Sequence, residues 1–233
     1  MKKVMAAAVV LAVLFLFGCA QTPSGPGPAG DPFVPEAGDL VDGFEDGNKI
    51  SEYGSIWTAV DDGARGGSSV VHSFDVVEGD AYEGTHALRL SATATAELSA
   101  EGYHQLYAAE YGYVIIKCNL GSSGADLSNT LNANMISFRV KETSGTGNLS
   151  LRGYIFNRSG QYVYTSTYSI SGSYNYASIN YETPSVPSGS SYSVSDVLQD
   201  ARRIEVEVKY SGFPGVVESF EVLFDSFKFG VVL

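Results

Sequence analysis

The stretch "ARRIEVEVKY", residues 201–210, carries the clearest structural pattern in the 233-residue sequence. Its apolar positions are Ile204, Val206 and Val208, and they alternate with the charged positions Arg203, Glu205, Glu207 and Lys209. Successive side chains of a β-strand point to opposite faces of the sheet. The alternation therefore predicts a half-buried antiparallel strand with its charged side toward solvent.

Similar alternation recurs along most of the chain after residue 40. It is visible in "ANMISFRVK" (133–141), "NLSLRGYIFN" (148–157), "GQYVYTSTYS" (160–169), "YNYASINYE" (174–182) and "SFEVLFDSFKF" (219–229). Turns rich in glycine, serine and asparagine separate these segments. The only helix candidate is "SVSDVLQDARR" (193–203), where Ser195 is the expected N-cap. About ten strands with one short helix predict an all-β fold, a two-sheet antiparallel β-sandwich of the jelly-roll type.

The N-terminus has the features of an export signal. Two lysines precede an apolar run at residues 4–17. A helix of this length reaches about 21 Å, short of the roughly 30 Å hydrocarbon layer, so we expect no permanent membrane span. The run ends in "LFGC" (16–19), which resembles the lipobox of bacterial lipoproteins. The resemblance implies removal of residues 1–18, acylation of Cys19 with palmitate-type chains, and a lipid anchor in the bacterial cell envelope, at the outer membrane or cell surface. The alternative is an ordinary signal cleaved nearby, which would leave a free thiol.

Proline and glycine are dense up to residue 39, so residues 19–39 are interpreted as the lipidated cysteine and a flexible linker. Residues 40–233 then form one domain, since no second composition break or repeat divides them. The formal net charge of −12 disfavours nucleic acid as a partner. With Cys19 acylated, only Cys118 remains, so no intramolecular disulfide is expected, and Cys118 is expected to be a buried, inert thiol.

Five motifs occur in the order seen in one group of β-sandwich proteins. They are "GFEDG" (43–47), Trp57, "GGSS" (66–69), "YEGTHALRL" (82–90) and "FEVLFDSFKF" (220–229). Together they resemble the family 11 carbohydrate-binding modules and the complex I intermediate-associated protein 30 domains, within the galactose-binding-like group. The resemblance implies the jelly roll and, as partner, a carbohydrate whose identity the sequence does not specify.

The same resemblance implies a structural calcium ion between the first and last strands. Its carboxylate ligands would be Glu45 and Asp225, with help from the turn around Glu83. Calcium prefers six to eight oxygen ligands, which carboxylates and loop carbonyls can supply. In the alternative interpretation, Glu45 is an exposed strand residue and Asp225 accepts backbone hydrogen bonds.

The sequence holds fifteen tyrosines, many of them on neighbouring predicted strands. If these strands pair in sequence order, one sheet face carries a band of aromatic and hydrogen-bonding side chains. The candidate ligand residues are Arg139, Arg152, Tyr154, Tyr162, Tyr164, Tyr168, Tyr174 and Tyr176. Sugar rings need flat aromatic platforms, here Tyr154 and Tyr176, and fixed polar groups such as the two arginines. The competing interpretation is that the tyrosines pack in the core.

The sequence contains no HExxH or GxSxG motif and no phosphate-binding glycine loop, so we do not expect an enzyme. The leading hypothesis is a lipid-anchored, non-catalytic protein that binds poly- or oligosaccharide. The alternative is a structural or assembly lipoprotein that uses the same sandwich to bind another envelope protein.

Overall fold

The computed structural model describes residues 31–96, 111–128, 133–212 and 215–230. The expected signal at 1–18, the lipidated Cys19 and the part of the predicted 19–39 linker up to residue 30 lie outside the described residues. The rest of that segment is packed on the domain, since the Phe33 ring stacks on Tyr53 with centroids 4.5 Å apart, so the prediction of a flexible linker is wrong there. Within the described ranges, no helix is long and apolar enough to cross a membrane.

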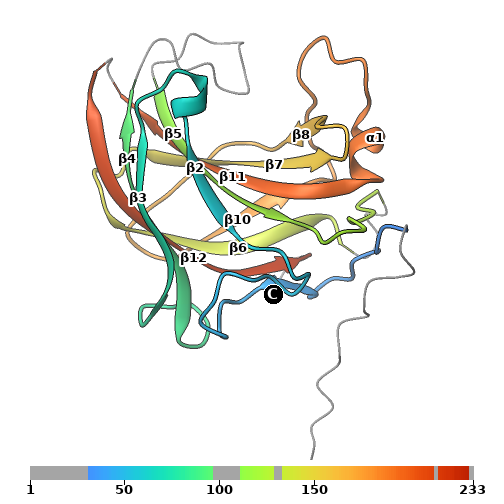
Figure 1. The fold of residues 1–233 in the computed structure, drawn as a ribbon, viewed down its shortest axis with the longest axis horizontal. Coiled ribbons are helices and arrows are strands. Elements are labelled where there is room, and N and C mark those ends of the chain that lie inside the picture. The colour runs from blue at the N-terminus through green and yellow to red at the C-terminus, as the bar shows by residue number, and fades with distance from the viewer. Residues whose placement is uncertain (1–30, 97–110, 129–132, 213–214, 231–233) are drawn as a thin grey trace, which may run out of the picture.

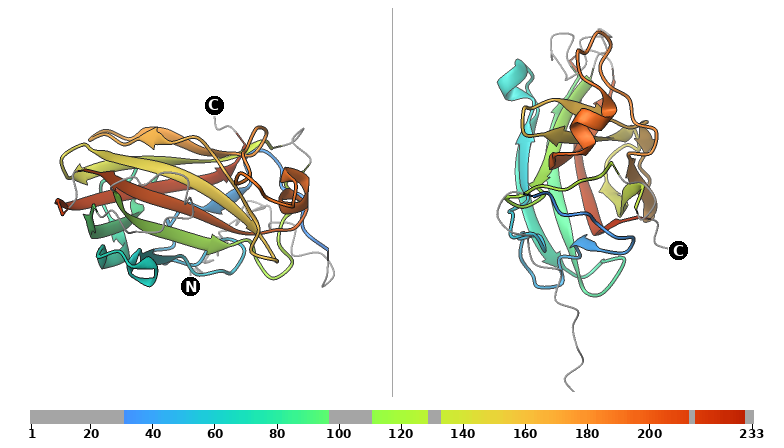
Figure 2. Two further views of the ribbon diagram at one scale, coloured as in Figure 1. Left: turned by 90° about the horizontal axis from the view of Figure 1, so that it is seen from above. Right: turned by 90° about the vertical axis from the view of Figure 1, so that its right-hand side faces the viewer.

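Across the described residues, twelve strands form two antiparallel sheets that face each other as two layers (Figures 1 and 2). The first, the β12 sheet, has the order β10-β6-β12-β4-β3, with β1 also beside β12. Its strands are β1 (Leu40–Asp42), β3 (Val70–Glu78), β4 (His86–Thr95), β6 (Met135–Ser144), β10 (Asn175–Asn180) and β12 (Val217–Phe229). The two-sheet all-β prediction is confirmed.

The second sheet, the β11 sheet, has the order β2-β5-β11-β7-β8, and β9 also pairs with β7. Its strands are β2 (Thr58–Asp61), β5 (Tyr111–Asn119), β7 (Leu149–Asn157), β8 (Tyr162–Tyr164), β9 (Tyr168–Ser169) and β11 (Ala201–Ser211). A short 3-10 helix, Gly63–Arg65, follows β2, and the helix α1, Val194–Leu198, precedes β11.

Strand β11 has the expected alternation but not the expected exposure. Its apolar positions lie in the core between the sheets. On the other side, Glu205 and Glu207 are only 1% and 3% exposed, so the prediction of a solvent-facing charged side is wrong for these two residues. The physical reason is that β11 is central in its sheet. Glu205 lies opposite Tyr154 and Glu207 opposite Arg152, so neighbouring side chains shield both carboxylates.

Aromatic rings from distant parts of the chain fill the core beneath the first strand. Phe227 of β12 lies 4.6 Å from both Trp57 and Phe138, measured between ring centroids. The Trp57 indole N–H donates to a carboxylate oxygen of Asp42 in β1, at 2.9 Å. Since β1 pairs with the end of β12, the expected contact between the first and last strands is confirmed.

Two smaller predictions concern α1 and the cysteine. The N-cap of α1 is Ser193, not Ser195, because the helix begins at Val194. The Ser193 hydroxyl accepts from the Asp196 amide, and the Asp196 carboxylate accepts from the Ser193 amide, which forms a capping box. Cys118 is buried in the core, and burial raises the pKa of its thiol to about 12, as expected for an inert cysteine.

Candidate functional site

The eight candidate ligand residues divide between the two sheets. β7 pairs with β8 as expected, but β10 pairs with β6 in the other sheet. The prediction of one continuous aromatic band is therefore wrong, because the chain crosses between the sheets after β9. The β11 sheet carries Arg152, Tyr154, Tyr162 and Tyr164, and the β12 sheet carries Arg139 and Tyr176, with Tyr174 just before β10.

Tyr168 faces neither outer surface. The segment 160–169 was expected to be a single strand, but β8 ends at Tyr164 and β9 begins at Tyr168. Tyr168 lies opposite the core residue Leu151 and packs against the core. Its hydroxyl is 3.2 Å from that of Ser178 in β10, so it links the two sheets at their edge.

The outer surface of β7, β8 and β11 is called the β11 face here. It consists of Arg152, Tyr154, Phe156, Tyr162, Tyr164, Arg203, Glu205 and Glu207. Tyr154 lies at its centre, with ring centroids 5.9 Å from Tyr162 and 6.5 Å from Tyr164. The side chain of Tyr154 is 0% exposed, so it supports its neighbours instead of presenting the open ring face that was expected. Tyr162 and Tyr164 are partly exposed.

Charged groups on the β11 face are held next to these rings. The Arg152 guanidinium lies over the Tyr164 ring, 5.6 Å from its centroid, and donates to the Thr167 hydroxyl at 3.0 Å. Arg203 lies over the Phe156 ring at 4.4 Å and pairs with Glu205 at 2.7 Å. These contacts fix hydrogen-bonding groups beside aromatic rings, as sugar recognition requires.

Two buried carboxylates on the β11 face were missed as site residues. The Tyr154 hydroxyl donates to Oε2 of Glu207 at 3.2 Å. Burial raises the pKa of Glu207, and the nearby cations Arg152 and Lys209 oppose this effect. The alternation in residues 201–210 placed Glu205 and Glu207 on the correct side of the strand, but it gave no sign of their burial.

The opposite surface of the molecule carries the remaining candidates. The turn at residues 79–85 between β3 and β4 folds over the outer side of β6 and β12. It brings Tyr82 to Arg139, whose guanidinium lies 4.3 Å from the ring centroid. Tyr176, directly opposite Arg139 in the register of β10 and β6, lies on the other side at 5.4 Å. Tyr82 was not among the predicted ligand residues, because its motif indicated only the turn.

Two of the proposed calcium ligands, Glu45 and Asp225, accept hydrogen bonds from backbone amides at residues 82–86. The amides of Tyr82 and Glu83 donate to one oxygen of Asp225, at 2.8 and 2.9 Å. The amides of Thr85 and His86 donate to Glu45 at 2.9 to 3.0 Å. These amides therefore occupy the carboxylate oxygens that a calcium ion would need as ligands.

The remaining carboxylate does not complete a metal site. Glu83 pairs with Lys228 at 2.6 Å. Among the described residues, no group of three or more His, Cys, Asp or Glu side chains is arranged to hold a metal ion. The arrangement therefore does not fit a shared calcium ion, and calcium binding stays an untested prediction.

No protein-family model matches the sequence, and no curated protein matches it. Solved structures of similar fold do match. The family 11 carbohydrate-binding module of the cellulosomal cellulase Lic26A-Cel5E of Clostridium thermocellum gives a TM-score of 0.53 at 17% identity, over 86% of this chain and 96% of that one. A family 11 module from the same organism, in complex with a β-1,3-1,4-mixed-linked tetrasaccharide, gives 0.53 at 18% identity, over 85% and 98%. At these identities the likeness establishes the β-sandwich fold.

Proposed function

We propose that this chain is a non-catalytic carbohydrate-binding protein and that its β11 face holds the ligand. The observation that carries the proposal is the grouping of two partly exposed tyrosine rings, Tyr162 and Tyr164, with the fixed guanidinium of Arg152. The fold supports it, because structures of the same fold include a module bound to a tetrasaccharide.

The chemistry of this face suits a poly- or oligosaccharide. Sugar rings have apolar C–H faces that stack on aromatic rings, while their hydroxyl groups need fixed donors and acceptors. Tyr162 and Tyr164 supply the rings, and Arg152 supplies donors. The buried pair Tyr154 and Glu207 lies beneath them and fixes their positions through ring contacts and one hydrogen bond.

The proposal includes a lipid anchor at Cys19, which would hold the protein at a bacterial membrane. Its support is the sequence alone: a short apolar run followed by "LFGC" and a linker rich in proline and glycine. Labelling cells with radioactive palmitate should mark the protein, and Cys19→Ala should remove the label. An unlabelled wild-type protein would contradict the anchor without affecting the sugar-binding proposal.

The direct test is a glycan screen with the full chain purified in detergent. The panel should hold mixed-linkage β-1,3-1,4-glucan, xylan and bacterial cell-wall glycans. We expect saturable binding to at least one neutral glycan with no increase in reducing ends, since binding without cleavage is proposed. If the folded protein bound no glycan, the proposal would be wrong, and capture of an envelope protein would become the better account.

A further inference from the structure

The surface opposite the β11 face has its own aromatic and cationic cluster, called the β12 face here. It consists of Tyr82, Arg139, Lys141, Tyr174 and Tyr176. The Arg139 guanidinium lies between two rings from different elements, Tyr82 from the turn and Tyr176 from β10. These rings are 45% and 39% exposed, so both present open surface to a ligand.

Several contacts hold the turn in place on this face. Asp225 accepts hydrogen bonds from the amides of Tyr82 and Glu83, and the Tyr174 ring packs edge-on against Tyr82 with centroids 5.7 Å apart. Lys141 pairs with Asp80 at 2.7 Å. Tyr82 and the turn that carries it are therefore held beside Arg139 before any ligand binds, which lowers the entropy cost of binding.

The charges of this cluster are unevenly compensated. Lys141 and Lys228 each have a carboxylate partner, Asp80 and Glu83 respectively. Within the described residues, Arg139 has no carboxylate within the 4.0 Å of an ion pair. Glu83 lines a small hollow together with Arg139, and Lys228 and, more weakly, Arg139 lower the pKa of its carboxyl group. The close contacts of Arg139 are with ring faces, which leave the N–H groups at the edge of the guanidinium for a ligand.

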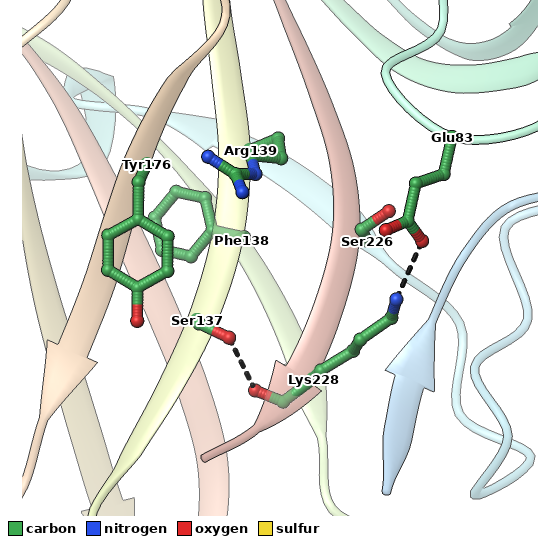
Figure 3. Close-up of a pocket in the computed structure, with 7 residues that line it drawn as sticks. All are labelled: Glu83, Ser137, Phe138, Arg139, Tyr176, Ser226 and Lys228. Atoms are coloured by element: carbon green, nitrogen blue, oxygen red, sulfur yellow. Dashed lines mark hydrogen bonds and ion pairs between the residues drawn. The ribbon is translucent and has the colours of Figure 1, made fainter. Parts of the chain in front are cut away.

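This hollow lies beside Arg139, as Figure 3 shows. It is lined by Glu83, Ser137, Phe138, Arg139, Tyr176, Ser226 and Lys228. The space inside it is enough for about one water molecule, so it does not enclose a ligand. A ligand on this face would lie over the exposed rings and the N–H edge of Arg139.

We propose that the β12 face is a second binding site, specific for acidic glycans that carry uronate residues. The carboxylate of the sugar would bind the N–H edge of Arg139, whose planar fork matches a carboxylate in two parallel hydrogen bonds. The apolar face of the sugar ring would stack on Tyr176 or Tyr82. The chain has a net charge of −12, so an acidic ligand meets general repulsion and needs a cation such as Arg139 at the point of contact.

This second site does not depend on the proposed function of the β11 face. Isothermal titration of the full chain in detergent with hexagalacturonate should show saturable binding. Arg139→Gln should weaken this binding at least tenfold, and Arg139→Lys should give an intermediate loss because it keeps the charge without the fork. The control is Arg158→Gln, an exposed arginine just after β7 of the other sheet, which should change the affinity less than twofold.

Other outcomes distinguish the alternatives. Raising NaCl from 50 to 500 mM should weaken hexagalacturonate binding in the wild type more than in Arg139→Gln, since screening acts on the charge contact. Equal affinity in Arg139→Gln and the wild type would overturn the second site, provided the variant melts normally. If Tyr164→Ala but not Arg139→Gln removed binding, the acidic glycan would bind the β11 face. If the wild type bound hexagalacturonate but no neutral glycan, only the proposed function of the β11 face would be contradicted.

Discussion

The hydroxyl of Tyr154 donates to a carboxylate oxygen of Glu207 across 3.2 Å, on the outer surface of the β11 sheet. Both side chains are buried, although the alternating sequence places them on the side that usually faces solvent. A buried carboxylate is costly unless hydrogen bonds or opposite charges compensate it. The pair is therefore part of what holds the proposed sugar-binding face in shape.

Removing this hydroxyl should destabilise the protein. Tyr154→Phe keeps the ring contacts but takes one donor from Glu207, so we expect the free energy of unfolding to fall by about 1–3 kcal/mol. Urea unfolding followed by fluorescence measures the change. The control, Tyr82→Phe, alters an exposed tyrosine and should change stability by less than about 0.5 kcal/mol. Equal effects in the two variants would show that the pair contributes nothing.

The turn over β12 requires glycine at residue 84 both for its positive φ and because the Glu45 carboxyl group leaves no room for a Cβ. Both Gly79 and Gly84 have positive φ, at +86° and +67°. A Cβ at Gly79 would meet nothing within 4 Å, whereas one at Gly84 would lie 2.2 Å from the Glu45 carboxyl group. Gly84→Ala must displace Glu45 from the amides of Thr85 and His86.

Gly84→Ala should therefore cost about 1–2 kcal/mol more than Gly79→Ala, which adds only the strain of positive φ. Thermal unfolding of the two variants gives the comparison. If both melted at the same temperature, the hydrogen bonds of Glu45 would not stabilise the fold.

Stability should depend on the protonation of Asp42. Burial raises the pKa of this carboxyl group to about 7, against the lowering effect of hydrogen bonds from Phe44 and Trp57. An unfolded aspartate titrates near pH 3.9. Between about pH 4 and 7, Asp42 therefore holds a proton in the folded state that it has lost in the unfolded state. The stability that this proton contributes is lost as the pH rises through 7.

The variant Asp42→Asn cannot titrate, so its melting temperature should fall by several °C less between pH 5 and pH 8 than that of the wild type. Other buried acids also titrate, which is why the difference between the two proteins is the informative quantity. Asp31→Asn, at an exposed position, should behave like the wild type. A pH dependence identical in Asp42→Asn and the wild type would contradict the assignment.

Calcium can be tested by chelation. If Glu45 and Asp225 ligated one ion, a hundredfold excess over Kd would add about 2.7 kcal/mol, and chelation would lower the melting temperature by roughly 5–11 °C. Because backbone amides already occupy both carboxylates, we expect EDTA to change the melting temperature by less than about 2 °C. A drop of 5 °C or more would show that an ion replaces these donors.

The sandwich was predictable because period-two alternation and glycine-rich turns are local properties of the sequence. The contact of the first strand with the last was also expected, because the resemblance to family 11 carbohydrate-binding modules implies it. Pairing between strands is not local. Nothing in residues 160–182 shows that β10 leaves the β11 sheet for the other one, or that the segment breaks so that Tyr168 turns inward.

The kinds of side chain in the candidate site could be predicted from the sequence, but which of them lie together could be predicted only in part. Arg152, Tyr154, Tyr162 and Tyr164 do lie together, since β7 and β8 are adjacent in the chain and pair. Glu205 and Glu207 join them from a strand about fifty residues later in the chain, so no local pattern reveals this contact. For the same reason, no local pattern indicates that the turn at Tyr82 covers Arg139.

In the proposed function, the β11 face binds a neutral oligosaccharide through Tyr162, Tyr164 and Arg152. The most direct measurement is isothermal titration of the full chain with the β-1,3-1,4-linked glucan tetrasaccharide and with the best neutral ligand from the glycan screen, for the wild type, Tyr164→Ala and Tyr176→Ala. Loss of stacking on an aromatic ring costs up to about 1.5 kcal/mol, so Tyr164→Ala should weaken binding about five- to tenfold. Tyr176→Ala, on the opposite face, should leave it within twofold. Equal affinity in Tyr164→Ala and the wild type, with both proteins folded, would contradict the account.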